Sequence, residues 1–258
     1  MRIGFSTSSF YTIPKVDTKR AISTFRELGC EVIELSASQP NRIEWLKQLK
    51  RQDVAGFSFI SIHTPNAQRM AMLSKKERHE LLSVFVDASQ RLKVDCILFH
   101  PDEWLGDYSI LKEYDMPVTI ENMDCCNTVG TTVDSIQEIL ARGDFKMTLD
   151  LNHCYTHDKT MQLAHDFYNA FADKISHFHL SDFNEALSAD EPAHWHNSFF
   201  RCKNNIILEN IPSFDKPIIL EESLLNGEEA KIELEYLKIF FNKIICQTKK
   251  TPECKRKF

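Results

Sequence analysis

The feature that most constrains this chain is a series of short apolar runs with strand character that end on a histidine or an acidic residue. Six such runs end at His63, His100, Glu121, Asp150, His179 and Glu221. In a (β/α)8 barrel, the side chains that perform chemistry gather at the carboxyl ends of the strands. The pattern therefore predicts a barrel enzyme whose site lies at one end of the barrel.

Strand-like runs alternate with amphipathic helical stretches along the whole chain, which is typical of consecutive βαβ units. We expect strands near 2–6, 31–35, 57–62, 95–100, 117–121, 145–150, 175–180 and 217–221. We expect helices over 17–28, 74–92, 132–140, 159–171 and 228–245. The 258 residues suit one barrel. The prediction is an α/β fold, a single-domain (β/α)8 TIM barrel over residues 1–248, followed by a basic C-terminal tail at 249–258.

Charge and cysteine content narrow the class of protein. The chain has 31 basic and 37 acidic residues, a net charge of -6, so no basic field is available to hold a nucleic acid. Its eight cysteines contain no CxxC pair, which indicates free thiols in a reducing compartment. No apolar run approaches the roughly 20 residues needed to span a bilayer. We expect a cytoplasmic protein with a small-molecule substrate and no membrane partner; the oligomeric state, a homo-oligomer included, stays open.

Strand alternation decides which way the polar strand ends point, because residues two apart in a strand share a face. The apolar residues of each run should face the helices, and the six polar ends should face the barrel mouth. Carboxylate and imidazole groups together suit a divalent ion. The expected ligands of a first ion are Glu121, Asp150, His179 and Glu221. The expected ligands of further ions are His63, His100, His153, His194 and His196.

Other polar residues have weaker assignments. His153 lies three residues past Asp150, where we expect a loop, and can reach either a second ion or the substrate. The long connection 182–205 contains Arg201 and Lys203, and we predict that one of them holds a substrate phosphate. Three further residues lie close to the expected ligands. We expect His177 to be a hydrogen-bonded core residue. Glu34 could equally bind substrate or form a salt bridge inside the barrel. We expect Glu222 to be structural, because it points to the opposite face from Glu221.

Six motifs in order carry a family resemblance. They are Ser61-Ile-His63-Thr-Pro65, Phe99-His100-Pro101, Ile120-Glu121-Asn122-Met123, Leu149-Asp150-x-x-His153, His179-Leu-Ser-Asp182 and Ile219-Leu-Glu221. From about residue 2 to about residue 240, the chain resembles the xylose-isomerase-like TIM-barrel superfamily. That superfamily contains sugar isomerases and epimerases, and AP endonucleases of the endonuclease IV type.

The two branches imply different sites. The isomerase and epimerase branch implies one Mn²⁺ or similar ion on the four first-ion ligands, with Glu121 and Glu221 moving protons beside a ketose carbonyl and His153 contacting the substrate. The endonuclease branch implies three zinc ions around a phosphodiester. It adds His63, His100, His153 and an Asp-x-His pair to the four ligands. That pair is His194-Trp195-His196 here, so His194 replaces the aspartate.

Two departures from the endonuclease pattern affect the ranking. The segment Asn197-Ser198-Phe199-Phe200-Arg201 stands where the family has glycines, and Asn66 stands near the place of a DNA-contacting tyrosine. With the acidic net charge, these departures rank DNA repair second. The leading prediction is a metal-dependent isomerase or epimerase of a small sugar or sugar phosphate, with one to three ions of Mn, Zn or Fe. The alternatives are an endonuclease IV-like phosphodiesterase and a metal-binding barrel without catalysis.

Overall fold

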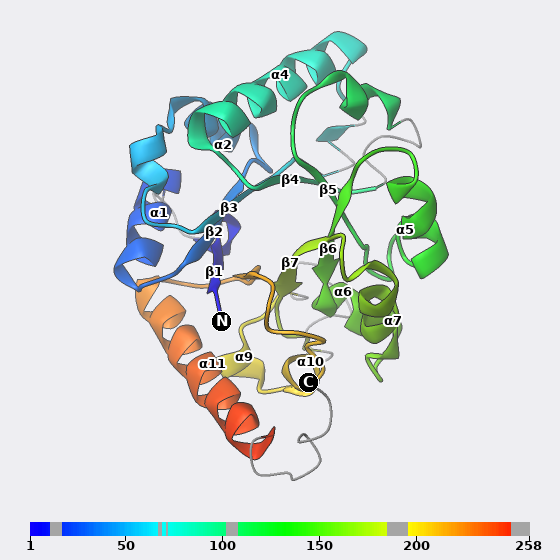
Figure 1. Ribbon diagram of the computed structural model, residues 1–258. Helices are drawn as coiled ribbons and strands as arrows, with labels where there is room; N and C mark the ends of the chain where they lie inside the picture. Colours follow the sequence, from blue (N-terminus) through cyan, green and yellow to red (C-terminus); the bar gives the residue numbers. More distant parts are fainter. Residues whose placement is uncertain (11–16, 67–68, 71, 102–107, 185–195, 249–258) are drawn as a thin grey trace.

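The computed structural model describes residues 1–10, 17–66, 69–70, 72–101, 108–184 and 196–248. In this part of the chain, parallel strands β1 to β8 follow one another around a closed barrel, and β8 pairs with β1. Figure 1 shows the strands around a central axis, with the helices outside them. The predicted single-domain (β/α)8 barrel is confirmed. His194 and the basic tail at 249–258 lie outside the described residues.

All eight strands lie where the apolar runs predict them, to within two residues at each end. They are β1 (Ile3–Ser6), β2 (Val32–Ser36), β3 (Phe59–His63), β4 (Cys96–Phe99), β5 (Val118–Glu121), β6 (Lys146–Asp150), β7 (Ile175–Leu180) and β8 (Ile218–Leu220).

The five predicted helices are also present. They are α1 (Thr18–Glu27), α4 (Lys75–Leu92), α5 (Val133–Leu140), α7 (Gln162–Phe171) and α11 (Gly227–Thr248). Side-chain caps fix where they begin: Asp17 accepts a hydrogen bond from the amide of Arg20, and Ser74 forms a capping box with Glu77.

Several short elements were not predicted. They are α2 (Pro40–Gln48), α6 (Leu151–His157), α9 (Phe199–Cys202), α10 (Ile206–Glu209), and the 3-10 turns η1 (Thr7–Phe10), η2 (Arg51–Val54) and η3 (Ser109–Glu113). Helix α6 corrects the expectation of a loop around His153. It starts directly after β6 because Oδ1 of Asp150 caps it, accepting from the amide of His153 at 2.8 Å.

The two faces of the strands carry different side chains, as the alternation predicts. Residues such as Ile62, Ile97 and Leu149 belong to the main core, which includes the surrounding helices. Inside the barrel, a separate small apolar cluster comprises Val32, Phe59, Cys96 and Ile219. Further along the same strands towards their carboxyl ends, most interior side chains are polar, Glu34, Ser61 and Glu221 among them, so an apolar layer lies beneath a largely polar mouth.

Strand β7 contains an irregularity beneath the site. Its register with β6 shifts between Met147, which pairs with Ile175, and Thr148, which pairs with His177. Ser176 is therefore an extra residue opposite that step, as in a β-bulge. The bulge places the Ser176 hydroxyl 2.8 Å from Nδ1 of His177, at the base of the polar interior.

Two further expectations can be compared with the structure. Free thiols are found at Cys30, Cys96, Cys125, Cys126, Cys154 and Cys202, and Cys30, Cys96 and Cys154 are buried. Within the described residues, no helix is both long enough and apolar enough to cross a membrane.

Candidate metal centre

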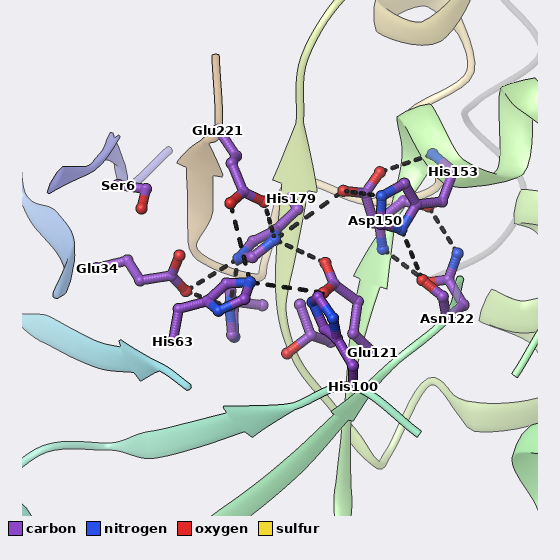
Figure 2. A network of polar contacts seen from close by, with 12 residues as sticks. Ser6, Glu34, His63, His100, Glu121, Asn122, Asp150, His153, His179 and Glu221 are labelled. Atoms are coloured by element: carbon purple, nitrogen blue, oxygen red, sulfur yellow. Dashed lines mark hydrogen bonds and ion pairs between the residues drawn. The ribbon is translucent and has the colours of Figure 1, made fainter. Parts of the chain in front are cut away.

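Four strand-end residues bring their ligand atoms together at the barrel mouth. The four residues come from β5, β6, β7 and the position directly after β8. They are Glu121, Asp150, His179 and Glu221, and their ligand atoms all lie within 4.8 Å of one another. Nδ1 of His179 lies 2.8 Å from Oε1 of Glu121 and 3.1 Å from Oε2 of Glu221. It lies 4.0 Å from Oδ2 of Asp150. Figure 2 shows the His179 ring at the centre of this group.

A second group of ligand atoms shares Glu121 with the first. His63, His100 and Glu121 form a set with the same 4.8 Å limit. Nε2 of His100 lies 3.1 Å from Oε2 of Glu121, and Nε2 of His63 lies 3.9 Å from the same oxygen. The two oxygens of Glu121 thus face different groups, Oε1 towards His179 and Oε2 towards the other two histidines. A carboxylate in this position can bridge two ions.

The hydrogen bonding of the buried polar atoms in the site indicates whether these residues suit a metal ion. Within the site, four buried atoms form ion pairs but no well-directed hydrogen bond to a described residue: both carboxylate oxygens of Glu121, Oδ2 of Asp150 and Nδ1 of His179. Buried polar atoms are normally hydrogen-bonded, so the concentration of such atoms at one point requires an explanation. Ligands about 2.0–2.2 Å from one ion lie about 3 Å apart. The separations of 2.8 and 3.1 Å agree with that spacing, so the residues fit a divalent ion.

Backbone carbonyls fix the orientation of two imidazole rings. Nδ1 of His63 lies 2.7 Å from the carbonyl oxygen of Thr64, and Nδ1 of His153 lies 2.7 Å from that of Asn122. A carbonyl oxygen only accepts, so each Nδ1 carries a proton and each Nε2 is the nitrogen left to bind an ion once its own proton is released. Nε2 of each ring faces into the site: that of His153 is 3.7 Å from Oδ2 of Asp150. Held in this way, both rings have the tautomer that a metal ligand needs.

His196 lies at the edge of the site. Its Nδ1 is 3.0 Å from Oγ of Ser181, and its ring centre is 5.8 Å from that of His153. The structure thus places His153 and His196 together on the Asp150 side of the cluster. It brings eight of the nine predicted metal ligands to one mouth, and the ninth, His194, lies outside the described residues.

Asn122 supports the site although the sequence analysis gave it no role. Its Oδ1 accepts from the amide of Asp150 at 2.8 Å, and its Nδ2 donates to the carbonyl of Asp150 at 2.9 Å. The side chain thus joins the end of β5 to the end of β6 and fixes the separation of Glu121 and Asp150. Its position directly after Glu121, in a motif that contains a ligand, is the only feature of the sequence that could have indicated this role.

Burial and neighbouring charges shift the acid–base equilibria of the metal-free site. Burial opposes ionisation of Glu221, but the hydrogen bond and charge of His179 outweigh it and lower the pKa of Glu221 to about 2. Burial also opposes the charged form of His179, yet Glu34 and Glu121 raise its pKa well above the usual value. Protons on the imidazoles therefore balance the carboxylates when no ion is bound, and ion binding must release protons.

The two predicted phosphate-binding cations lie apart from the ligand groups. Arg201 forms an ion pair with Glu229 of α11 and donates to the carbonyl of Ser223 at 3.3 Å. Lys203 is exposed at the end of α9. In the portion of the chain that is described, neither forms an ion pair with a ligand of the cluster, so their contact with substrate stays a prediction.

Comparison with known proteins agrees with this architecture. No family model and no curated protein sequence matches the chain. Among solved structures, a D-tagatose 3-epimerase-like protein has 19% identity, covers 95% of this chain and 100% of its own, and superimposes with a TM-score of 0.63. Endonuclease IV from Thermus thermophilus has 15% identity, covers 94% of this chain and 100% of its own, and gives 0.66.

A third similar structure is the probable 3-DHS dehydratase involved in petrobactin synthesis from Bacillus anthracis. It has 18% identity, covers 92% of this chain and 99% of its own, and gives a TM-score of 0.64. These likenesses show that the chain shares the TIM-barrel fold of the three proteins. Since an epimerase-like protein, an endonuclease and a dehydratase share that fold, it does not select one reaction.

Proposed function

We propose that the chain is a metal-dependent hydrolase of a phosphoric diester, in which two or more divalent ions share Glu121. The second ligand group supports this proposal most strongly. One ion on the first group would leave His63 and His100 beside Glu121 without an ion to bind, whereas two ions would use both as ligands. Ions bound in such a pair supply Lewis acidity to both the attacking and the leaving oxygen of a displacement at phosphorus.

Charge balance supports the same conclusion. The two ligand groups contain three carboxylates, those of Glu121, Asp150 and Glu221, and otherwise only imidazoles. Three carboxylates exceed the charge of one divalent ion, so a single-ion centre would repel an anionic substrate. Two divalent ions exceed the charge of these three carboxylates and match it when the buried carboxylate of Glu34 beside His179 is also counted, so a two-ion centre would not repel a phosphate ester.

The solvent exposure of Glu121 and Glu221 suggests different roles for these two carboxylates. Glu121 is fully buried, which suits a bridging ligand, whereas 19% of the Glu221 side chain is exposed. Glu221 is therefore the carboxylate placed to accept a proton from an attacking water. His153 and His196 lie at the other side of the mouth, where they can bind a further ion or a phosphate oxygen. The net charge of -6 favours a small diester over a nucleic acid.

The second candidate is the isomerase or epimerase of a sugar or sugar phosphate that the sequence analysis ranks first. It is favoured by the two glutamates that approach Nδ1 of His179 from different strands. In that reaction one glutamate removes a proton from the carbon beside a carbonyl and the other returns it. It needs one ion, so His63 and His100 would then serve as structural partners of Glu121.

Metal content and turnover together distinguish the candidates. We expect protein purified without a chelator to contain two or three divalent ions per chain by elemental analysis. We also expect it to hydrolyse bis(p-nitrophenyl) phosphate, to lose that activity with a chelator, and to cleave abasic duplex DNA weakly at physiological salt. One ion per chain, with solvent deuterium entering a ketose or ketose phosphate, would favour the isomerase. Bound ions without any turnover would favour a binding barrel, and no ion with no thermal stabilisation by Mn²⁺, Zn²⁺ or Fe²⁺ would contradict the metal centre.

A further inference from the structure

A line of polar side chains continues from the ligand cluster into the barrel interior. Glu34 on β2 and His177 on β7 are both fully buried, and both lie on the far side of the His179 ring. Nε2 of His179 is 3.0 Å from Oε2 of Glu34 and 3.3 Å from Nε2 of His177. Figure 2 shows Glu34 across the ring from Asp150. The two nitrogens of His179 therefore have separate partners, the carboxylate cluster at Nδ1 and the interior pair at Nε2.

Hydrogen-bond direction can be followed from the base of the barrel. The carbonyl of Met147 only accepts, so the Ser176 hydroxyl donates to it at 3.1 Å. The Ser176 oxygen then accepts from Nδ1 of His177 at 2.8 Å. With its proton on Nδ1, a neutral His177 has a lone pair on Nε2, and that lone pair faces Nε2 of His179. The bulge in β7 thus sets the tautomer of His177.

A second acceptor faces the same atom of His179. Oε2 of Glu34 is held in place by the Ser61 hydroxyl, which donates to it at 2.9 Å. A single proton on Nε2 of His179 satisfies both Glu34 and His177. In the neutral ring that an ion would bind, that proton leaves the lone pair on Nδ1, where Glu121, Asp150 and Glu221 converge.

We propose that Glu34, assisted by His177, is a positioning residue that keeps the proton of His179 on Nε2 and thereby presents Nδ1 to the metal ion. The inference rests on the metal centre of the proposed function and is independent of which reaction the centre catalyses. A hydrogen-bond acceptor behind a ligating histidine fixes the tautomer and the orientation of the ring. Removing such a partner typically lowers metal affinity about 10–100-fold. The sequence left Glu34 open between substrate binding and a salt bridge; its complete burial argues against substrate contact.

The test is the dissociation constant for Zn²⁺ of the full chain and three variants. We expect Glu34→Ala to weaken binding about 10–100-fold, and Glu34→Gln to recover most of the loss, because the amide oxygen still accepts from Nε2. Glu233→Gln is the matched control. Glu233 is also a fully buried glutamate, but it bonds to the amides of Phe199 and Phe200 and lies outside both ligand groups. We expect its replacement to leave Zn²⁺ affinity unchanged.

Each remaining outcome has a definite meaning. Unchanged affinity in Glu34→Ala would overturn the inference while leaving the metal centre intact. Equal losses in the Ala and Gln variants would also overturn it, since Glu34 would then act through its charge or as a ligand. Failure of the wild-type chain to bind Zn²⁺ would overturn both the inference and the proposed function. If Glu34→Ala does not fold, ¹⁵N NMR of the zinc-loaded wild type decides: a proton on Nε2 of His179 supports the inference, and coordination through Nε2 overturns it.

Discussion

Glu221 and Glu222 are chemically identical neighbours in the chain, yet they lie in opposite environments. Glu221 points into the barrel among imidazoles, and the hydrogen bond and charge of His179 outweigh burial to hold its pKa at about 2. Glu222 points outward and is buried, and burial together with Glu233 raises its pKa well above the usual value. The side of the strand therefore decides whether a carboxylate is an ionised ligand or a neutral structural group.

Glu222 and two further carboxylates, Glu233 and Asp182, form a second group on the outer side of the barrel, which we call the outward group. Glu233 on α11 accepts from the amides of Phe199 and Phe200, both at 2.9 Å, and so joins α11 to the start of α9. Oδ2 of Asp182 accepts from the amide of Asn204 at 3.0 Å. This group anchors the described part of the connection that carries His196. The inward carboxylates are placed to bind ions, whereas the outward ones bind backbone amides of the connection beside the site.

The largest expected effect, on turnover and metal affinity, comes from replacing Glu221 and Glu222 separately by Gln. Glu221→Gln removes an ionised ligand, so we expect turnover and metal affinity to fall by about 100-fold or more, beyond the loss typical of a residue that only supports a ligand. Glu121→Gln should behave in the same way. Glu222→Gln replaces a neutral carboxyl by a neutral amide of the same shape and should leave metal affinity unchanged. Steady-state kinetics and Zn²⁺ titration of the three variants would check this, and a comparable loss in Glu222→Gln would remove the distinction between the two faces.

A smaller effect should appear in the pH dependence of stability. Burial raises the pKa of Glu233 to about 7, although the amides of Phe200 and Phe199 oppose the shift. The folded state therefore holds a proton that the unfolded state releases above its ordinary pKa, about 4.3. This contribution to stability is lost as the pH rises from about 4.3 to about 7 and is constant above that.

Replacing Glu233 by Gln should remove that dependence. We expect the wild-type free energy of unfolding, relative to Glu233→Gln, to fall by roughly 1–3 kcal/mol between about pH 5 and about pH 8. Urea unfolding of both metal-free proteins across this range measures the difference. Parallel curves for the two proteins would indicate that Glu233 is ionised throughout and that the outward group does not hold a proton.

The sequence predicted those features of the fold and site that follow from strand periodicity. Each strand face is set by a two-residue repeat, so His63, Glu121, Asp150, His179 and Glu221 could be assigned to one mouth before their distances were known. The ring tautomers could not be predicted, because they depend on backbone carbonyls such as that of Thr64, which no residue type specifies. The role of Asn122 was missed, and Glu34 was left open between substrate binding and the buried salt bridge that it forms with His179, because each depends on which atoms another strand presents.

The long connection 182–205 marks where the sequence was least informative. A phosphate contact from Arg201 is predicted because a cation in a loop at a barrel mouth is often functional. In the structure the side chain contacts Glu229 and the carbonyl of Ser223, and its contact with a phosphate stays a prediction. No periodic pattern in the sequence indicates which way a side chain in such a connection points.

The smallest expected effect, on stability and KM, tests whether Arg201 stabilises α11 or binds substrate. Its side chain is about one-third exposed, at 34%, so its ion pair with Glu229 should contribute less than about 1 kcal/mol to stability. We expect Arg201→Ala to lower the free energy of unfolding by no more than that and to leave KM unchanged, because Arg201 contacts α11 instead of the ligand groups. Lys203→Ala tests the other cation predicted to hold a substrate phosphate, which is exposed at the end of α9. A rise in KM for a phosphate-bearing substrate in Arg201→Ala alone would return Arg201 to the substrate site and show that the connection moves when substrate binds.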